Sequence, residues 1–348
     1  CFMYLHSINY FRAIAIIFVI SSHVFYLVDY DNSSFLPLFL YNTIVGSSTP
    51  FVFISGFLFH HVFYKKHNFK VFFVNKVKYV LFPYLIMSLA AILFSCYRMY
   101  GEGSSDFFAY VKTILFYYTT GSHIVAYWYV PFIMLLFLTS PLHVLFINAL
   151  KLKQQIAVVL IFLMVSVFIH RPNSLYVFKS IQALFYYTPV YLIGILCSMN
   201  REDLYDKLNN RKFMLFALFG VVSCAQIFFN KNGNSFKLPF EFEGLDLMIL
   251  QKICLSFFLF IFLHTLESSR ISFLTHVAKY SFGMFFIHGY VLYAYGIALN
   301  KFLTPSFIQT HNFLIFVFSS VIVIVVSLLL VKFMVYVFKH RSRYIVGS

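Results

Sequence analysis

The strongest constraint on the fold is a series of long apolar stretches that recur along the whole chain. Each is close to the length that a helix needs to cross the hydrocarbon core of a bilayer, about 20 residues. Ten such spans occur, with approximate ends: 8–28, 42–63, 79–97, 124–147, 155–170, 181–199, 212–230, 247–266, 277–299 and 312–338. The sequence therefore predicts an all-α polytopic membrane protein, with about ten transmembrane helices in one bundle and one domain over residues 1–348.

Composition supports this fold class. Hydrophobic residues make up 61% of the chain and charged residues 11%, whereas an average soluble domain has about 25% charged residues. A water-soluble globule has no place to hide that much apolar surface. The composition excludes a soluble enzyme, a disordered chain and a disulfide scaffold.

The positions of Lys and Arg predict the orientation in the membrane. If the N-terminus is inside, the inner side carries 17 of the 26 basic residues and the outer loops carry 8, and Arg12 lies within the first span. Since basic residues concentrate on the cytoplasmic side, we expect both termini in the cytoplasm. The same distribution accounts for the formal net charge of +15 without a nucleic-acid partner. Segment 107–118 is too short for a span, and we expect an interfacial or re-entrant helix there, since a further span would break the alternation.

Two ionisable residues lie in the first span, Arg12 and His23, which are 11 residues apart. Eleven helical residues turn by about 1100°, so both side chains face the same way, and they rise by about 16 Å. Ionisable groups at this depth usually line a polar cavity, and a neutral histidine there can act as a general base. The alternative is structural: Arg12 reaches the cytoplasmic edge and His23 bonds to a backbone carbonyl.

Other spans add polar candidates. His288 lies near the middle of the ninth span, with Ser281 seven residues earlier on roughly the same face. Ser55 lies between Pro50 and Gly56 in the second span, where the default role of small residues is close helix packing.

The ends of two spans carry further candidates. Lys76 and Lys78 lie at the start of the third span, where basic residues either anchor the inner side or attract phosphates. Trp128 lies at the start of the fourth span. It is either a site residue or, as is usual for a tryptophan at the end of a span, a residue of the aromatic belt at the membrane interface. The spans hold no metal-binding motif and no Asp or Glu for ion translocation, and we expect no metal.

Five segments occur in this order along the chain: the Arg12-x10-His23 pair, FVFISGF, KVKYVLFPY, YWYVPFIMLLFLTSPL and SFGMFFIH. Together, over residues 8–299, they resemble the membrane acyltransferase type 3 family, the O-acyltransferases of bacterial surface glycans. Within the family, the VKYVLFPYLIM segment is similar to the branch that modifies the intercellular adhesin.

The resemblance implies an acyl-CoA donor in the cytoplasm, acetyl-CoA or succinyl-CoA, and a hydroxyl acceptor on a surface polysaccharide or lipid-linked glycan. His23 is then the catalytic base, and Arg12 holds a phosphate or carbonyl of the donor. Lys76 and Lys78 stand where the family often has an RxxR motif. Lysines replace the arginines here and the spacing differs, so the fork-shaped grip of arginine on phosphate is missing.

The resemblance also suggests roles for the remaining candidates. We expect His288 to carry a second proton or stabilise the oxyanion, and we expect substrate contacts from Trp128, Ser55 and Ser281. The expected location is the cytoplasmic membrane of a bacterium, in contact with membrane lipid. Homo-oligomers and partners in glycan synthesis stay open. The alternatives are a non-enzymatic exporter of a polysaccharide or lipid-linked glycan, which needs a cavity but no base, and a scaffold subunit of a glycan synthase.

Overall fold

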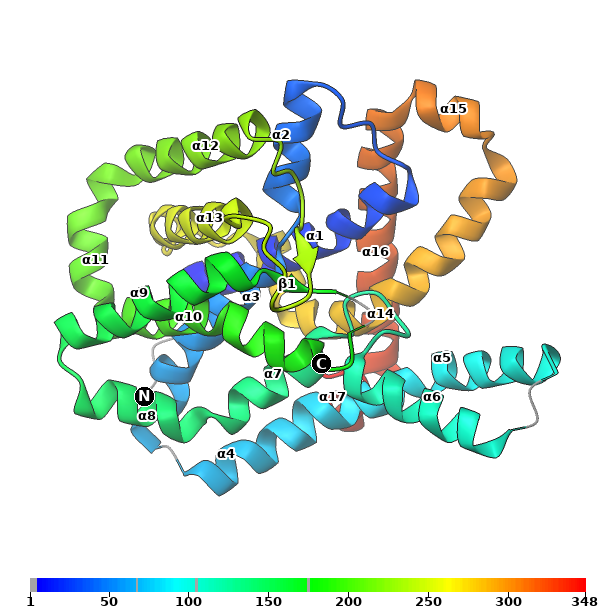
Figure 1. Ribbon diagram of the computed structural model, residues 1–348, viewed down its shortest axis with the longest axis horizontal. Coiled ribbons are helices and arrows are strands. Elements are labelled where there is room, and N and C mark those ends of the chain that lie inside the picture. The colour runs from blue at the N-terminus through cyan, green and yellow to red at the C-terminus, as the bar shows by residue number, and fades with distance from the viewer. Residues whose placement is uncertain (1–4, 67, 104–105, 174–175) are drawn as a thin grey trace.

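The computed structural model describes residues 5–66, 68–103, 106–173 and 176–348, and these are almost entirely helical (Figure 1). The α-helices are α1 (His6–Leu27), α2 (Phe35–Ile44), α3 (Ser48–Leu58), α4 (Phe69–Lys76), α5 (Phe82–Gly101), α6 (Phe107–Thr120), α7 (Tyr129–Leu138), α8 (Ser140–Ala149), α9 (Leu152–Ile169), α10 (Lys179–Met199), α11 (Arg201–Leu208), α12 (Lys212–Phe228), α13 (Leu247–His264), α14 (Ser272–Phe302), α15 (Pro305–Thr310), α16 (Asn312–Phe338) and α17 (Ser342–Ile345).

Short elements complete the described fold. Two are π-helical turns that extend neighbouring helices, η1 (Phe59–Phe63) and η3 (Val77–Leu81). Three are 3-10 turns: η2 (Tyr64–Lys66), η4 (Asn209–Arg211) and η5 (Lys339–Arg341). Two short strands, β1 (Arg171–Pro172) and β2 (Phe236–Lys237), pair in parallel between the helices.

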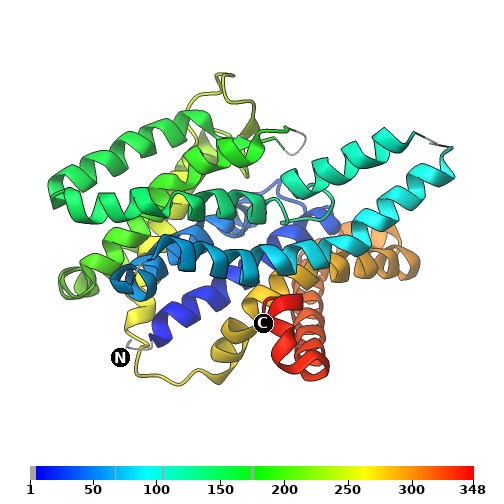
Figure 2. The ribbon, with the colours of Figure 1, turned by 90° about the horizontal axis from the view of Figure 1, so that it is seen from below.

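The predicted fold class is confirmed. Among the described residues, nine helical segments are long and apolar enough to cross a membrane, and the bent pair α7–α8 brings the number to ten. Each predicted span coincides with one of these ten segments. The short helix expected at 107–118 is α6, which has 14 residues. It forms a hairpin with α5 that projects from the body of the molecule (Figures 1 and 2).

The second predicted span, 42–63, is not one continuous helix. The chain leaves helical geometry between α2 and α3, where Gly46 has φ +81°. A Cβ atom at Gly46 would lie 3.0 Å from the sulfur of Met248. The Nζ of Lys252, on α13, donates to the carbonyl oxygens of Asn42 (2.7 Å) and Thr43 (2.6 Å). The break is stable because this buried ammonium satisfies carbonyls at the end of α2 that no helical amide reaches.

The fourth predicted span, 124–147, also differs from a single helix. Residues before Tyr129 form turns, and α7 and α8 meet at an angle of 49°. Pro141 lies in the first turn of α8, where it has no amide hydrogen to continue the hydrogen-bond ladder of α7. The bend is therefore encoded locally, by proline, whereas the break at Gly46 depends on a distant helix.

Helices α3 and α10 pack backbone against backbone. A Cβ atom added to Gly56 would lie 2.0 Å from the carbonyl oxygen of Tyr191, and one added to Gly194 would lie 2.1 Å from that of Phe53. No larger side chain fits at either glycine without moving a helix. The close packing predicted for the segment around Gly56 is confirmed.

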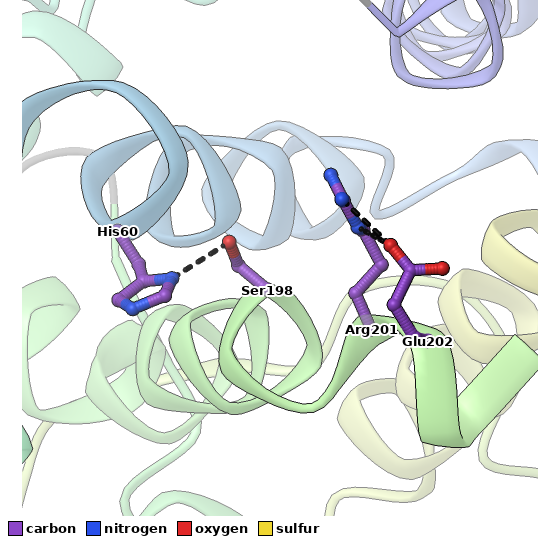
Figure 3. A network of polar contacts seen from close by, with 4 residues as sticks. All are labelled: His60, Ser198, Arg201 and Glu202. Atoms are coloured by element: carbon purple, nitrogen blue, oxygen red, sulfur yellow. Dashed lines mark hydrogen bonds and ion pairs between the residues drawn. The ribbon is translucent and has the colours of Figure 1, made fainter. Parts of the chain in front are cut away.

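One polar contact joins the ends of these helices, and an ion pair within α11 (Arg201–Leu208) lies next to it (Figure 3). The ring of His60, in η1, shares a hydrogen bond of 2.9 Å between Nδ1 and the hydroxyl of Ser198, near the end of α10. Just beyond, Arg201 forms an ion pair of 2.6 Å with Glu202.

The first and last spanning helices, α1 and α16, have their chain ends on the same side of the bundle. The carboxylate of Glu267 accepts the backbone amides of His6 (2.6 Å) and Ser7 (2.9 Å) at the start of α1. Near the end of α16, the Lys332 ammonium lies 6.0 Å from the ring centroid of Tyr280. Glu267 and Tyr280 flank the start of α14, so both ends lie near it. That this side faces the cytoplasm stays a prediction.

Candidate active site

A cavity of about 630 Å³ lies inside the bundle, and its lining comes from α1, α3, α4, α7, α10, α14, α17 and the segments between helices. Six of the eight predicted site residues line it: Arg12, His23, Ser55, Lys76, Trp128 and Ser281. Residues far apart in sequence therefore share one cavity. The other two predicted residues, His288 and Lys78, are not part of the lining.

Arg12 and His23 both face the cavity from α1, as their spacing predicts. The Nη2 of Arg12 donates to the hydroxyl of Ser281 on α14 at 3.1 Å. That hydroxyl in turn donates to the carbonyl oxygen of Ala278 at 2.9 Å. Ser281 thus positions the Arg12 guanidinium at the wall of the cavity.

His288 packs behind His23. The two imidazole rings are stacked, with centroids 5.6 Å apart and planes at 26°. His288 is fully buried, and its Nδ1 lies 3.1 Å from the carbonyl oxygen of Met284. Its Nε2 has no hydrogen-bond partner among the described residues. The contact places His288 to orient the His23 ring, while His23 alone of the pair reaches the cavity.

Lys76 and Lys78 point to different sides of their helix. Side chains two residues apart are separated by about 200° on a helix, so both cannot face one cavity. The Lys76 ammonium lies over three rings, with centroid distances of 4.4 Å to Phe63, 5.0 Å to Phe72 and 4.5 Å to Phe137. The Lys78 side chain is exposed and lies over other rings, those of Tyr79 and Tyr344.

Trp128 faces the cavity rather than lipid at the edge of the bundle. Its ring stacks on that of Tyr187, with centroids 6.0 Å apart and planes at 24°. Ser55 lines the cavity from α3, one residue before the glycine that packs on α10. The backbone contact between these helices therefore fixes the position of Ser55.

Two lining residues have no predicted role, Arg171 and Arg343. Arg343 lies after the last span, and its guanidinium carbon is 4.2 Å from the ring centroid of Tyr79. Arg171 is on β1 and is 6% exposed. Its predicted position in an outer loop, against the orientation bias, was an available signal. Both side chains reach the cavity only in the folded chain, so the sequence of each span taken alone does not predict their position.

The charges that line the cavity have one sign. Arg12, Lys76, Arg171 and Arg343 line it, and none of the described lining residues is an Asp or Glu. A low-dielectric cavity with cationic walls attracts anions. No group of three or more His, Cys, Asp or Glu side chains in the described ranges is arranged to hold a metal ion.

Comparison with known families agrees with this geometry. A family model described as an acyltransferase domain matches residues 5–332. The chain belongs to this family, the membrane acyltransferase type 3 family, and it is an acyltransferase embedded in a membrane by many helices. No curated protein and no solved structure gives a significant match. Family membership favours the enzyme over the exporter and the scaffold, while the intercellular-adhesin branch stays a prediction.

Proposed function

We propose that the enzyme transfers an acetyl or succinyl group from cytoplasmic acyl-CoA to a hydroxyl of a cell-surface polysaccharide or its lipid-linked precursor, in the cytoplasmic membrane of a bacterium. The observation that carries the proposal is the shared cavity. It joins a histidine that can act as a base to a wall with four cations and no carboxylate among its described residues. A phosphorylated donor matches that charge.

The donor phosphates would bind at the basic lining residues Arg12, Lys76 and Arg343. Acyl-CoA carries several phosphate charges, and a cavity of opposite charge raises its local concentration. Arg12 lies about 16 Å from His23 along α1, a separation that suits a phosphate at Arg12 and the thioester at His23. The exposed Lys78 would then contribute only to the positive electrostatic potential at the surface near Arg343, which attracts the donor phosphates.

His23 would act as the general base. It takes the proton from the acceptor hydroxyl while the oxygen attacks the thioester carbonyl, which activates a weak nucleophile. The carbon–sulfur bond then breaks, and the protonated His23 returns the proton to the departing thiolate, which yields an ester and free CoA. His288 would hold the His23 ring by stacking. Trp128, Ser55 and Ser281 would contact the substrates or position the groups that do.

The test is acyl transfer from radiolabelled acetyl-CoA, and in parallel from radiolabelled succinyl-CoA, into glycan of isolated membranes. We expect His23→Ala to lower transfer by at least about 100-fold, the scale of general-base catalysis. His276→Ala is the matched control because His276 is an exposed histidine on α14, outside the cavity lining. Transfer at the wild-type rate in His23→Ala at equal expression would remove His23 from the mechanism, and no label from either donor would contradict the proposed reaction.

A further inference from the structure

Arg171 is a buried cation that the acyl-transfer step above does not use. It lines the same cavity as His23 and only 6% of its surface is exposed. All 11 Asp and Glu residues of the chain lie in the described ranges. None of them has a carboxylate oxygen within 4.0 Å of the Arg171 guanidinium. A buried charge without a carboxylate in direct contact is costly, so an anion that makes such a contact would stabilise this arginine.

The contacts of the guanidinium leave some of its N–H groups without an acceptor among the described residues. The rings of Trp128 and Phe236 pack against it, with centroids 5.3 Å and 5.5 Å from its central carbon. Nη2 donates to the hydroxyl of Ser48 at 3.3 Å, and Nη1 donates to the side-chain oxygen of Asn234. Nε has no hydrogen-bond partner among the described residues. An arginine held in this way has unused N–H groups in the plane of its fork, the geometry that a carboxylate fits.

The groups around Arg171 in the cavity include hydrogen-bond donors and no carboxylate among the described lining residues. Ser47 and Ser48 line the cavity at the start of α3, a helix of 11 residues whose N-terminus carries partial positive charge. The side-chain oxygen of Asn234, which also lines the cavity, accepts from Arg171, and the amide N–H groups of that side chain are left as donors. The start of α3 and Asn234 thus add to the attraction of Arg171 for an anion.

Buried charges in this region do not balance. Arg171 and the fully buried Lys252 interact electrostatically, and both are cations. The buried carboxylate that interacts with Arg171, that of Asp246, is bonded to the hydroxyl of Tyr186 (2.7 Å) and the amide of Met248 (2.8 Å). Asp246 interacts with Arg171 but is already bonded to other groups, so an anionic ligand would add negative charge beside Arg171 and Lys252.

We propose that Arg171, with Asn234 and the start of α3, binds a carboxylate carried by one of the two substrates. The inference rests on the proposed acyl transfer and adds a determinant of substrate choice. The carboxylate has two sources: the far end of a dicarboxylic acyl group such as succinyl, or an acidic sugar of the acceptor. In either case the pair with Arg171 orients the substrate in the cavity of His23.

Binding to the detergent-purified full chain tests the proposal with two matched pairs of probes. One pair is succinyl-CoA and acetyl-CoA, and the other is sodium glucuronate and glucose with equal sodium chloride. In at least one pair we expect the acidic member to bind about tenfold or more tightly than its neutral partner. Arg171→Gln removes that preference. Arg98→Gln is the control because Arg98 is exposed in α5, in an ion pair with Glu102, and it keeps the preference.

The two pairs distinguish the sources. A preference that depends on Arg171 within the CoA pair assigns the site to the acyl group, and one within the sugar pair assigns it to the acceptor. The proposal is overturned if neither pair shows a preference, or if the preference survives in Arg171→Gln. Failure of the proposed acyl transfer gives a different result, because neither thioester binds and no label is transferred. In that case the comparison of glucuronate with glucose alone tests whether Arg171 binds a carboxylate.

A second variant keeps the test valid if Arg171→Gln does not fold. Arg171→Lys keeps the charge but loses the fork, so we expect a reduced preference of a few-fold rather than none. If Arg171→Gln does not elute as a single species in size-exclusion chromatography, Arg171→Lys carries the comparison. A preference equal to that of the wild type in a well-folded Arg171→Lys would rule out recognition by the planar fork.

Discussion

At the scale of residues, the proposed proton transfer depends on the stacked pair of His23 and His288. His23 reaches the cavity, whereas His288 is buried behind it with its Nδ1 at a helix carbonyl. We therefore favour a positioning role for His288 over the expected role as second proton carrier. A small shift of a catalytic ring is enough to slow a reaction by orders of magnitude.

This assignment predicts the behaviour of two variants. His288→Ala removes the stack and should lower kcat for acyl transfer by about 10- to 100-fold with little change in the KM for acyl-CoA. His288→Phe keeps an aromatic ring, so it should recover much of the lost rate and keep the wild-type pH profile. The measurement is initial rates of label transfer between pH 5 and 9. A folded His288→Phe that is as slow as His288→Ala would show that the reaction needs the nitrogen.

The sequence predicted part of the site for a clear physical reason. Arg12 and His23 lie on one helix, so their spacing alone places them on one face. The opposite directions of Lys76 and Lys78 follow from the same geometry, although resemblance to a family motif had grouped them. Arg171 comes from a loop, and no local pattern fixes where a loop side chain ends after folding.

At the scale of elements, the contact between α3 and α10 has the strictest geometry. Gly56→Ala would place a methyl group 2.0 Å from the carbonyl oxygen of Tyr191. We expect a loss of at least about 1–3 kcal/mol of stability, the usual cost of overpacking, because a carbonyl cannot move aside as a side chain can. Thermal unfolding in detergent measures the effect, and transfer activity should fall with it because Ser55 is adjacent.

Gly220→Ala is the matched control. Gly220 lies within α12 and a Cβ atom there meets nothing within 4 Å. Alanine is the better helix former by about 1 kcal/mol, so this variant should unfold at the same temperature or slightly higher. Equal melting temperatures for Gly56→Ala and the wild type would contradict the backbone contact.

The breaks in the helices show which features of the fold cannot be predicted from the local sequence. Span lengths were predictable because the bilayer fixes how many apolar residues a crossing helix needs. The bend after α7 has a local cause in Pro141. The break between α2 and α3 depends on Lys252, about 200 residues away, which satisfies the carbonyls at the end of α2. Only the folded chain brings that ammonium to them.

At the scale of the whole molecule, the orientation of the bundle determines which substrate meets which end of the cavity. Basic residues predict that the ends of α1 and α16 face the cytoplasm. Green fluorescent protein fused after Ser348 should therefore fluoresce, and alkaline phosphatase fused there should be inactive. Alkaline phosphatase fused after Glu102, between α5 and α6, should be active. The reverse pattern would place the cations proposed to bind the donor on the wrong side for cytoplasmic acyl-CoA.

The glycine contact between α3 and α10 also bears on motion. Helices that touch through their backbones resist sliding and rotation relative to one another, so this wall of the cavity is rigid. Substrates of different size can then enter and leave only if another wall yields. Arg343 and Gly347 line the cavity from the C-terminal segment, where α17 rests on α5 and η3. Product release would then depend on the other walls, this C-terminal segment among them, rather than on the pair of helices that carries Ser55.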